Sequence, residues 1–151
     1  MIKKGAKAML LAGILLLVLT GCEKMNDNDD CDSVTPVCSC AYIGIVDSEG
    51  NSLLGADNVY DPAEISLSNE GQLIELIEDD LGRDDLYLRF FFGEMVSGED
   101  YLLQLNETET DILNLEITEN IGPCFTTYTI QKFNLNGTEI IAVEEVYLIE
   151  K

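Results

Sequence analysis

The chain has 151 residues, with 29 Asp and Glu against eight Lys and Arg, no His, no Trp and five Cys, and its formal net charge is −21. This length suits a single domain, and a hydrophobic content of 46% is enough to build a core. The acidic excess excludes a nucleic-acid-binding protein, because contacts with phosphates need clustered Lys and Arg. The lack of histidine excludes Ser-His-Asp and Cys-His catalytic systems and His-ligated zinc.

The first 21 residues have the pattern of a secretory signal. Lys3, Lys4 and Lys7 form a positive start, and residues 8–20 are an apolar run of 13 residues. A membrane-spanning helix needs about 20 residues, whereas a signal peptide needs only a shorter apolar run. We therefore expect residues 1–21 to be a signal peptide.

The leader ends in Leu19-Thr20-Gly21, and Cys22 follows it. This tetrapeptide resembles the lipobox of bacterial lipoproteins. The resemblance implies that a signal peptidase recognises Leu19, Thr20 and Gly21, cuts before Cys22, and leaves that cysteine carrying acyl chains such as palmitate. Two or three chains, at about 0.8 kcal/mol per buried CH₂, form a lasting anchor on the outer membrane of the cell envelope. The alternative is an ordinary signal peptide followed by an unmodified cysteine.

Removal of this leader makes the net charge more negative. It takes three of the eight basic residues and none of the acids, so the mature chain of 130 residues has a net charge of −24. A body this negative is repelled by anionic lipids, so we expect contact with the membrane through the acyl chains on Cys22 alone. We expect residues 22–37 to form an acidic flexible tether. Its start, 23–30, resembles the acidic export signal of Bacteroidota surface lipoproteins, which implies exposure at the cell surface; a plain spacer facing the periplasm is the alternative.

We expect residues 38–151 to form one β-sandwich domain. Short apolar runs alternate with turn signals every eight to twelve residues, which is typical of an all-β fold. Asn136-Gly137 is a strong hairpin signal. The fold class we expect is all-β, an antiparallel β-sandwich of about seven to eight strands. The expected strands, in chain order, are 42–46, 64–67, 86–92, 101–105, 112–117, 125–133 and 138–143, and 145–149 continues or follows the last of them.

One segment, residues 72–81, is ambiguous. Leu73, Leu76 and Ile77 have helical spacing, but Ile74 and Leu76 also fit one face of a strand. We favour a strand, because strands surround the segment and Gly71 weakens a helix start.

Residues 44–56 contain a strand, a D-x-x-G turn and an L-x-G-A element. They resemble the opening of transthyretin-like, carboxypeptidase-regulatory-type domains. The whole mature chain, with its Cys-x-Cys, late lone Cys and terminal Asn-Gly hairpin, also resembles small Bacteroidota lipoproteins of unknown function. These resemblances imply an Ig-like or transthyretin-like sandwich and no named activity.

Four cysteines remain after Cys22, and an exported chain meets an oxidising compartment, so two disulfides are expected among Cys31, Cys38, Cys40 and Cys124. Cys38 and Cys40 lie two apart, and on an extended strand their Cα atoms would be about 6.6 Å apart with parallel side chains, which disfavours a bond between them. Either Cys31–Cys38 with Cys40–Cys124, or Cys31–Cys40 with Cys38–Cys124, then remains. A Cys₄ zinc site is the alternative, but the spacing lacks C-x₂-C pairs.

The acids suggest a weak calcium site. Asp47, Glu49 and Asn51 offer oxygen atoms at alternate positions, and a second acidic group spans 78–85. Neither matches an EF-hand loop, and solvated turns explain both. We expect no cofactor and no other metal, with calcium as the alternative.

No nucleophile system is visible, so we expect a non-catalytic binding or structural module with an unknown protein or glycan partner. With 29 acids, some carboxylate pair lies at a glycosidase separation by chance. The alternative is a calcium- or glycan-binding adhesion domain. Without tryptophan, a platform for sugars would have to come from tyrosines, namely Tyr42, Tyr60, Tyr87, Tyr101, Tyr128 and Tyr147.

Overall fold

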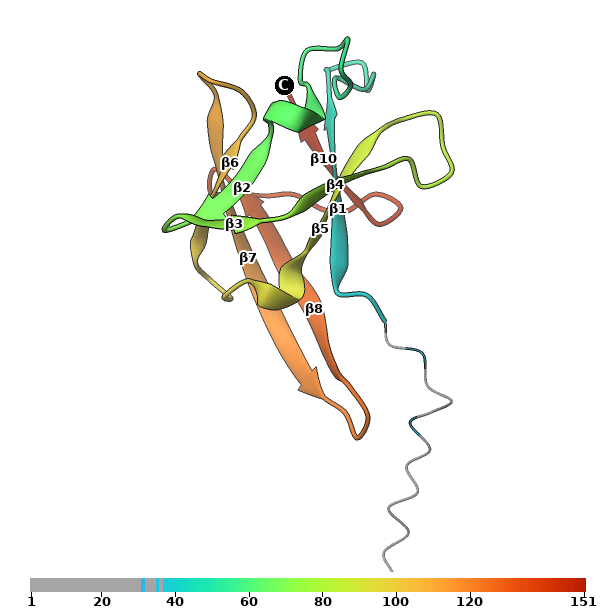
Figure 1. Ribbon diagram of the computed structural model, residues 1–151, viewed down its shortest axis with the longest axis vertical. Helices are drawn as coiled ribbons and strands as arrows, with labels where there is room; N and C mark the ends of the chain where they lie inside the picture. Colours follow the sequence, from blue (N-terminus) through green and yellow to red (C-terminus); the bar gives the residue numbers. More distant parts are fainter. Residues whose placement is uncertain (1–30, 32–34, 36) are drawn as a thin grey trace, which may run out of the picture.

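The computed structural model describes residues 31, 35 and 37–151, which form two β-sheets (Figure 1). The predicted signal peptide, the predicted lipobox (Leu19, Thr20, Gly21 and Cys22) and most of the predicted tether lie outside the described residues. Within the described part of the chain, no helix is long and apolar enough to cross a membrane.

The first sheet has four strands in the order β10-β1-β5-β4, and the second has six in the order β3-β2-β6-β7-β8-β9. Two 3₁₀ turns, η2 (Pro62–Glu64) and η3 (Phe92–Glu94), lie between strands. The strand bounds are β1 Cys40–Val46, β2 Ser66–Asn69, β3 Gln72–Ile74, β4 Leu76–Asp79, β5 Tyr87–Phe91, β6 Asp100–Gln104, β7 Thr110–Ile121, β8 Thr126–Leu135, β9 Thr138–Glu139 and β10 Val146–Glu150.

The expected all-β sandwich is confirmed. The described residues hold ten strands rather than seven or eight: β9 and β10 are separate strands, and the segment 72–81 adds two further strands, β3 and β4. β3 pairs with β2 in the six-stranded sheet, while β4 pairs with β5 in the four-stranded sheet. The chain passes from one sheet to the other at Glu75. Because β3 and β4 are both strands, the preference for strand over helix in this segment is also confirmed.

The core lies between the two sheets. Alternate side chains of β1 and β5 meet alternate side chains of β2, β6 and β7 there, as expected for strands with one buried face. Twelve side chains in the described part of the chain are less than 2% exposed: Phe90, Phe133, Ile43, Ile45, Leu67, Leu88, Leu103, Leu105, Leu113, Leu115, Ile149 and Val146. At about 1.5–3 kcal/mol for each buried aliphatic or aromatic side chain, this layer is the main source of stability.

One pairing departs from the predicted antiparallel arrangement. β10 lies parallel to β1, with Tyr42 opposite Val146 and Val46 opposite Glu150. The other strand pairs that the structure describes are antiparallel. A parallel pair needs a long connection, and here the whole domain supplies it, since β10 is the last strand and β1 the first.

The Asn136-Gly137 turn behaves as the sequence predicts. Both residues have positive φ, +52° and +78°, and they join β8 to the short strand β9. This is the conformation that a two-residue hairpin loop requires. The strand predicted over 138–143 is shorter than expected, because the chain leaves the sheet after Glu139 and turns again before β10.

Candidate binding groove

An aromatic groove of about 460 Å³ lies beside β1, β8 and β10. We define this aromatic groove by Tyr42 from β1, Phe92 from η3, Tyr128 and Ile130 from β8, and Tyr147 from β10. Ala41, Thr129, Ala142, Val37 and the two cysteines Cys38 and Cys40 also line it. The aromatic groove is therefore built by strands of both sheets, including the first strand of the domain, β1, and the last, β10.

The structure divides the six tyrosines into two groups. Tyr60, Tyr87 and Tyr101 are buried, with side chains 4–7% exposed. The Tyr60 hydroxyl donates to Glu109 Oε2 at 2.8 Å, and the Tyr101 hydroxyl accepts from the backbone N–H of Val96 at 2.8 Å. These hydroxyl groups serve the fold.

The remaining three, Tyr42, Tyr128 and Tyr147, are half-buried and all line the aromatic groove. The sequence identifies the six candidates, and the sheet topology selects these three, because β1, β8 and β10 contribute one each.

A β-bulge in β8 directs two of the lining side chains. The register between β7 and β8 shifts between Glu116 and Ile117, which pairs Ile117 with Ile130 and Glu116 with Lys132. An extra residue in one strand reverses the alternation of faces beyond it. Ile130 and Phe133, three apart, therefore both pack toward the core, and Tyr128 packs with them.

Close packing fixes Tyr128 against η3. A Cβ added at Gly93 would lie 3.3 Å from Tyr128 Cδ2 and 2.7 Å from Phe91 Cζ. Only glycine allows this approach without displacing a ring, since heavy atoms in contact lie about 3.5–4 Å apart.

Tyr147 is held by stacking. Its ring lies on that of Phe133 with 4.0 Å between centroids and 13° between planes. Burial raises the pKa of the Tyr147 hydroxyl, so the group stays neutral at physiological pH. Among the lining residues, all of them in the described part of the chain, Glu145 is the only charged one.

Glu145 is placed by an unusual turn. Glu144 and Glu145 both have positive φ, +49° and +73°. The backbone N–H and C=O groups of Val143 and Val146 bond to each other across them, at 2.8 and 3.0 Å. Such a two-residue turn favours Asn-Gly, so two glutamates there cost conformational energy. Strained backbone of this kind is often found beside functional sites.

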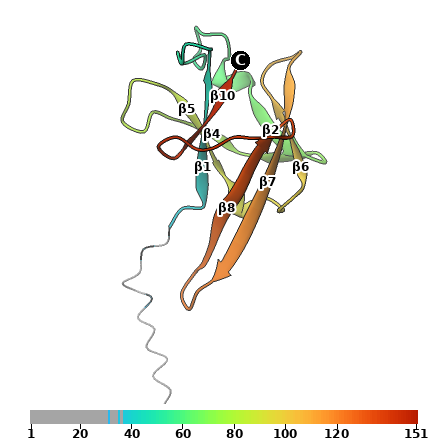
Figure 2. The ribbon, with the colours of Figure 1, turned by 180° about the vertical axis from the view of Figure 1, so that it is seen from behind.

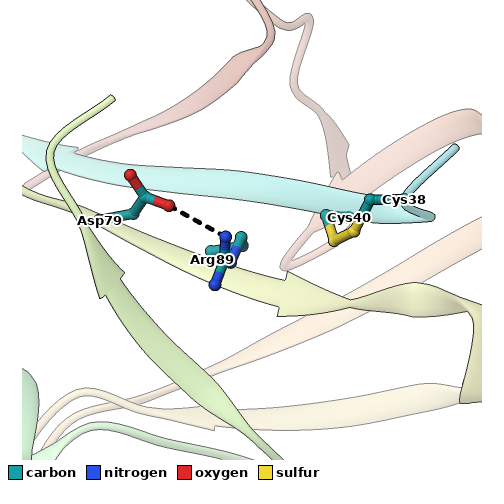
Figure 3. The surroundings of a disulfide bond; sticks show 4 residues. All are labelled: Cys38, Cys40, Asp79 and Arg89. Atoms are coloured by element: carbon teal, nitrogen blue, oxygen red, sulfur yellow. Dashed lines mark ion pairs between the residues drawn. A yellow bond between two sulfur atoms is a disulfide. The ribbon is translucent and has the colours of Figure 1, made fainter. Parts of the chain in front are cut away.

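The disulfides differ from the expected pairings. Cys31 is bonded to Cys124, with 5.4 Å between their Cα atoms. Cys38 is bonded to Cys40, with 5.2 Å between their Cα atoms, as Figure 3 shows. Both pairings left open by the sequence are therefore wrong. The estimate of about 6.6 Å assumed a strand through both cysteines, but β1 begins at Cys40 and Cys38 lies before it. Figure 3 also shows the ion pair between Arg89 and Asp79, at 3.2 Å, which joins β5 to β4.

The predicted calcium ligands form a closed turn. Asp47 Oδ1 accepts from the backbone N–H groups of Glu49 and Asn51, and its Oδ2 accepts from Asn51 Nδ2, each at 2.9 Å. These hydrogen bonds lower the pKa of Asp47, and the bond from the Asn51 side chain has the largest effect. Across residues 31, 35 and 37–151, no group of three or more Asp, Glu or Cys side chains is placed to hold a metal.

A polar cluster at the other end of β1 was not foreseen from the sequence. Lys151 Nζ lies 2.8 Å from Glu109 Oε1 and 2.6 Å from Asp111 Oδ2, and its backbone N–H donates to Val46 O at 2.9 Å. Asn136 Nδ2 donates to Asp111 Oδ1 at 2.7 Å. We call Lys151, Glu109 and Asp111 the lysine clasp, because it joins the end of β10 to the six-stranded sheet. No sequence signal marks it, since its members are scattered among 29 acids.

In comparisons with known proteins, no family model, curated protein or solved structure matches the chain.

Proposed function

We propose that this protein is a lipid-anchored lipoprotein of the outer membrane that binds its ligand, without catalysis, in the aromatic groove. The convergence of Tyr42, Tyr128 and Tyr147 on one hollow of about 460 Å³ carries the binding part of the proposal. Ligand sites in proteins are concave, mostly apolar, and contain a few polar groups that orient the ligand. The anchoring part is supported by the lipobox-like Leu19–Cys22 and its apolar leader.

The groove favours a neutral glycan as the ligand class. Tyrosine rings present a flat apolar face together with a hydroxyl group, which suits the mixed surface of a sugar ring. The lining holds no Lys or Arg among its described residues, and the mature chain carries −24 charges, so an anionic ligand is disfavoured. Calcium, the other alternative, gains no support, because both oxygens of Asp47 already accept hydrogen bonds within their own turn.

The anchor is tested on the native protein. Mass spectrometry of the N-terminal peptide from membrane fractions should find acyl groups on Cys22 and no residue before it. Cys22→Ser should move the protein from the membrane fraction to the soluble fraction, because its acyl chains are lost. A native peptide with an unmodified Cys22 would refute the anchor. Protease treatment of intact cells then assigns the leaflet: digestion indicates the cell surface, and protection indicates the periplasm.

The groove is tested with the mature domain and a panel of neutral polysaccharides, such as xylan, mannan and β-glucan, in affinity electrophoresis. Tyr128→Ala should weaken binding about tenfold, equivalent to ~1.4 kcal/mol, because the ring loses its contact with the sugar. Tyr128→Phe should keep most of the affinity. Phe125→Ala is the matched control, since Phe125 is an exposed aromatic near the start of β8 that does not line the groove.

Thermal melting of each variant separates loss of binding from loss of folding. Binding that survives Tyr128→Ala in a folded protein would remove the groove as the site. Retention of none of the polysaccharides would refute the glycan class.

A further inference from the structure

The β7–β8 hairpin extends beyond the other strands of both sheets, as the two opposite views show (Figures 1 and 2). We define the hairpin tip as residues 120–126. The turn closes with a hydrogen bond from the Gly122 N–H to Phe125 O at 3.1 Å. Ile121 is 82% exposed and Phe125 is 36% exposed, although both are large apolar side chains. The tip therefore presents apolar groups to solvent at one end of the molecule.

Residues 120–126 themselves carry no charge, although acids border them: Glu119 precedes the tip, and Asp30 and Asp32 flank Cys31 in the sequence. Residues 120–138 contain no Asp or Glu and a single Lys, and residues 33–46 contain no charged residue. The mature chain nevertheless carries 29 acids. Val59, which is 65% exposed, differs from Ile121 in having acids on both sides, Asp57 and Asp61. The average charge of −24 thus does not describe residues 120–126, and the expectation of contact through the acyl chains alone, which rested on that average, does not extend to them.

A disulfide connects the tip to the N-terminal part of the chain. Cys124 lies within the turn and is bonded to Cys31, 93 positions earlier. Cys22 precedes Cys31 by nine residues, and nine residues reach at most about 30 Å when fully extended. The position proposed for the acyl chains is therefore held within that reach of the tip.

We propose that the hairpin tip rests on the lipid bilayer beside the anchor, with Ile121 and Phe125 in contact with the lipid interface. The inference rests on the proposed acylation of Cys22. Apolar and aromatic side chains are favoured at the boundary between headgroups and acyl chains, and the residues of the tip itself carry no charge that would have to leave water there. One apolar hairpin would bind a membrane weakly alone, but the anchor keeps it at the surface, so the second contact is effectively intramolecular. The acid-rich loop around Val59 then faces away from the bilayer.

The absence of tryptophan from the sequence gives a clean test. Ile121→Trp places a single fluorophore at the tip, and Val59→Trp is the matched control, an exposed apolar residue far from the tip along the chain and surrounded by acids. The acylated proteins are reconstituted into phosphatidylcholine vesicles with and without brominated acyl chains. We expect bromolipid to remove more than half of the fluorescence of the Ile121→Trp protein and to leave that of the Val59→Trp protein nearly unchanged.

The outcomes separate this inference from the anchor. Equal fluorescence in both lipids for Ile121→Trp, in protein that floats with the vesicles, would refute contact of the tip while leaving the anchor intact. Equal quenching of both variants would also refute it, because the domain would then have no fixed orientation. Failure of the acylated proteins to float would instead refute the anchor. Cys31→Ser combined with Cys124→Ser should reduce the quenching at the tip while flotation is retained, because the tip is then no longer tied near the anchor.

Discussion

Replacement of Lys151 by methionine tests the lysine clasp. Methionine keeps an unbranched apolar stem but removes the ammonium group, so Lys151→Met mainly deletes charge. Asp111 then loses its cation while its side chain stays 6% exposed, and Glu109, 36% exposed, loses the same partner. Asn136 and Tyr60 still donate one hydrogen bond each to these carboxylates. The main cost is therefore an uncompensated charge at Asp111.

The magnitude follows from burial. Breaking a fully buried ion pair by removing one partner costs about 3–5 kcal/mol. The Lys151 side chain is 17% exposed and Asp111 keeps one hydrogen bond, so we expect a smaller loss, about 2–3 kcal/mol in the free energy of unfolding. At about 4 °C per kcal/mol for a domain of this size, the melting temperature should fall by roughly 8–12 °C.

The chain supplies a matched control. Lys132 Nζ lies 2.7 Å from Glu116 Oε1, but these side chains are 47% and 49% exposed. Lys132→Met should therefore cost less than about 1 kcal/mol. Urea unfolding of both variants at pH 7 compares them directly. If Lys151→Met costs no more than Lys132→Met, the clasp does not stabilise the fold and the reasoning from burial is wrong. Adding Asp111→Asn to Lys151→Met should recover part of the loss, since the unpaired charge is then absent.

Three further predictions concern acid stability, one turn and the disulfides. The hydrogen bonds that Glu109 accepts from Lys151 and Tyr60 lower its pKa from 4.5. Its contribution to stability is therefore complete above pH 4.5 and is lost as the pH falls through the lowered pKa, so Glu109→Gln should flatten the fall in melting temperature between about pH 5 and pH 3. Glu145→Gly should raise the free energy of unfolding by about 1 kcal/mol, because glycine adopts a φ of +73° without strain, and urea unfolding would show no gain if that turn is relaxed. Cleavage before aspartates without reduction should release peptide 32–46 with its own internal disulfide, separate from the two peptides that Cys31 and Cys124 join. If these three peptides were instead found joined to one another, one of the pairings rejected above would be correct.

The sequence was sufficient where structure depends on neighbouring residues. Leu113 and Leu115 alternate with polar residues and both are fully buried in β7, and Asn136-Gly137 makes the predicted turn. The strand preference over 72–81 was also right, but the change of sheet at Glu75 depends on which strands accept β3 and β4 as partners. That choice is made by long-range packing, which local patterns do not encode.

The candidate site depended on distant contacts and was only partly predictable. The six tyrosines could be named as candidates, but the selection of Tyr42, Tyr128 and Tyr147 required the parallel pairing of β1 with β10 and the bulge in β8. The disulfide pairing was predicted wrongly because a regular strand was assumed through Cys38. Lys151 gave no signal at all, since a lone basic residue near many acids has no preferred partner until the fold brings Glu109 and Asp111 beside it.

The parallel pairing of β10 with β1 also constrains the order of folding. β1 is one of the first described segments to be synthesised, and its partner β10 is among the last, so this edge of the four-stranded sheet stays open until residues 146–150 have emerged. Contacts this distant in sequence make folding slow and leave a strand edge unpaired in the meantime. During synthesis, the four-stranded sheet therefore cannot be completed until its last strand has emerged.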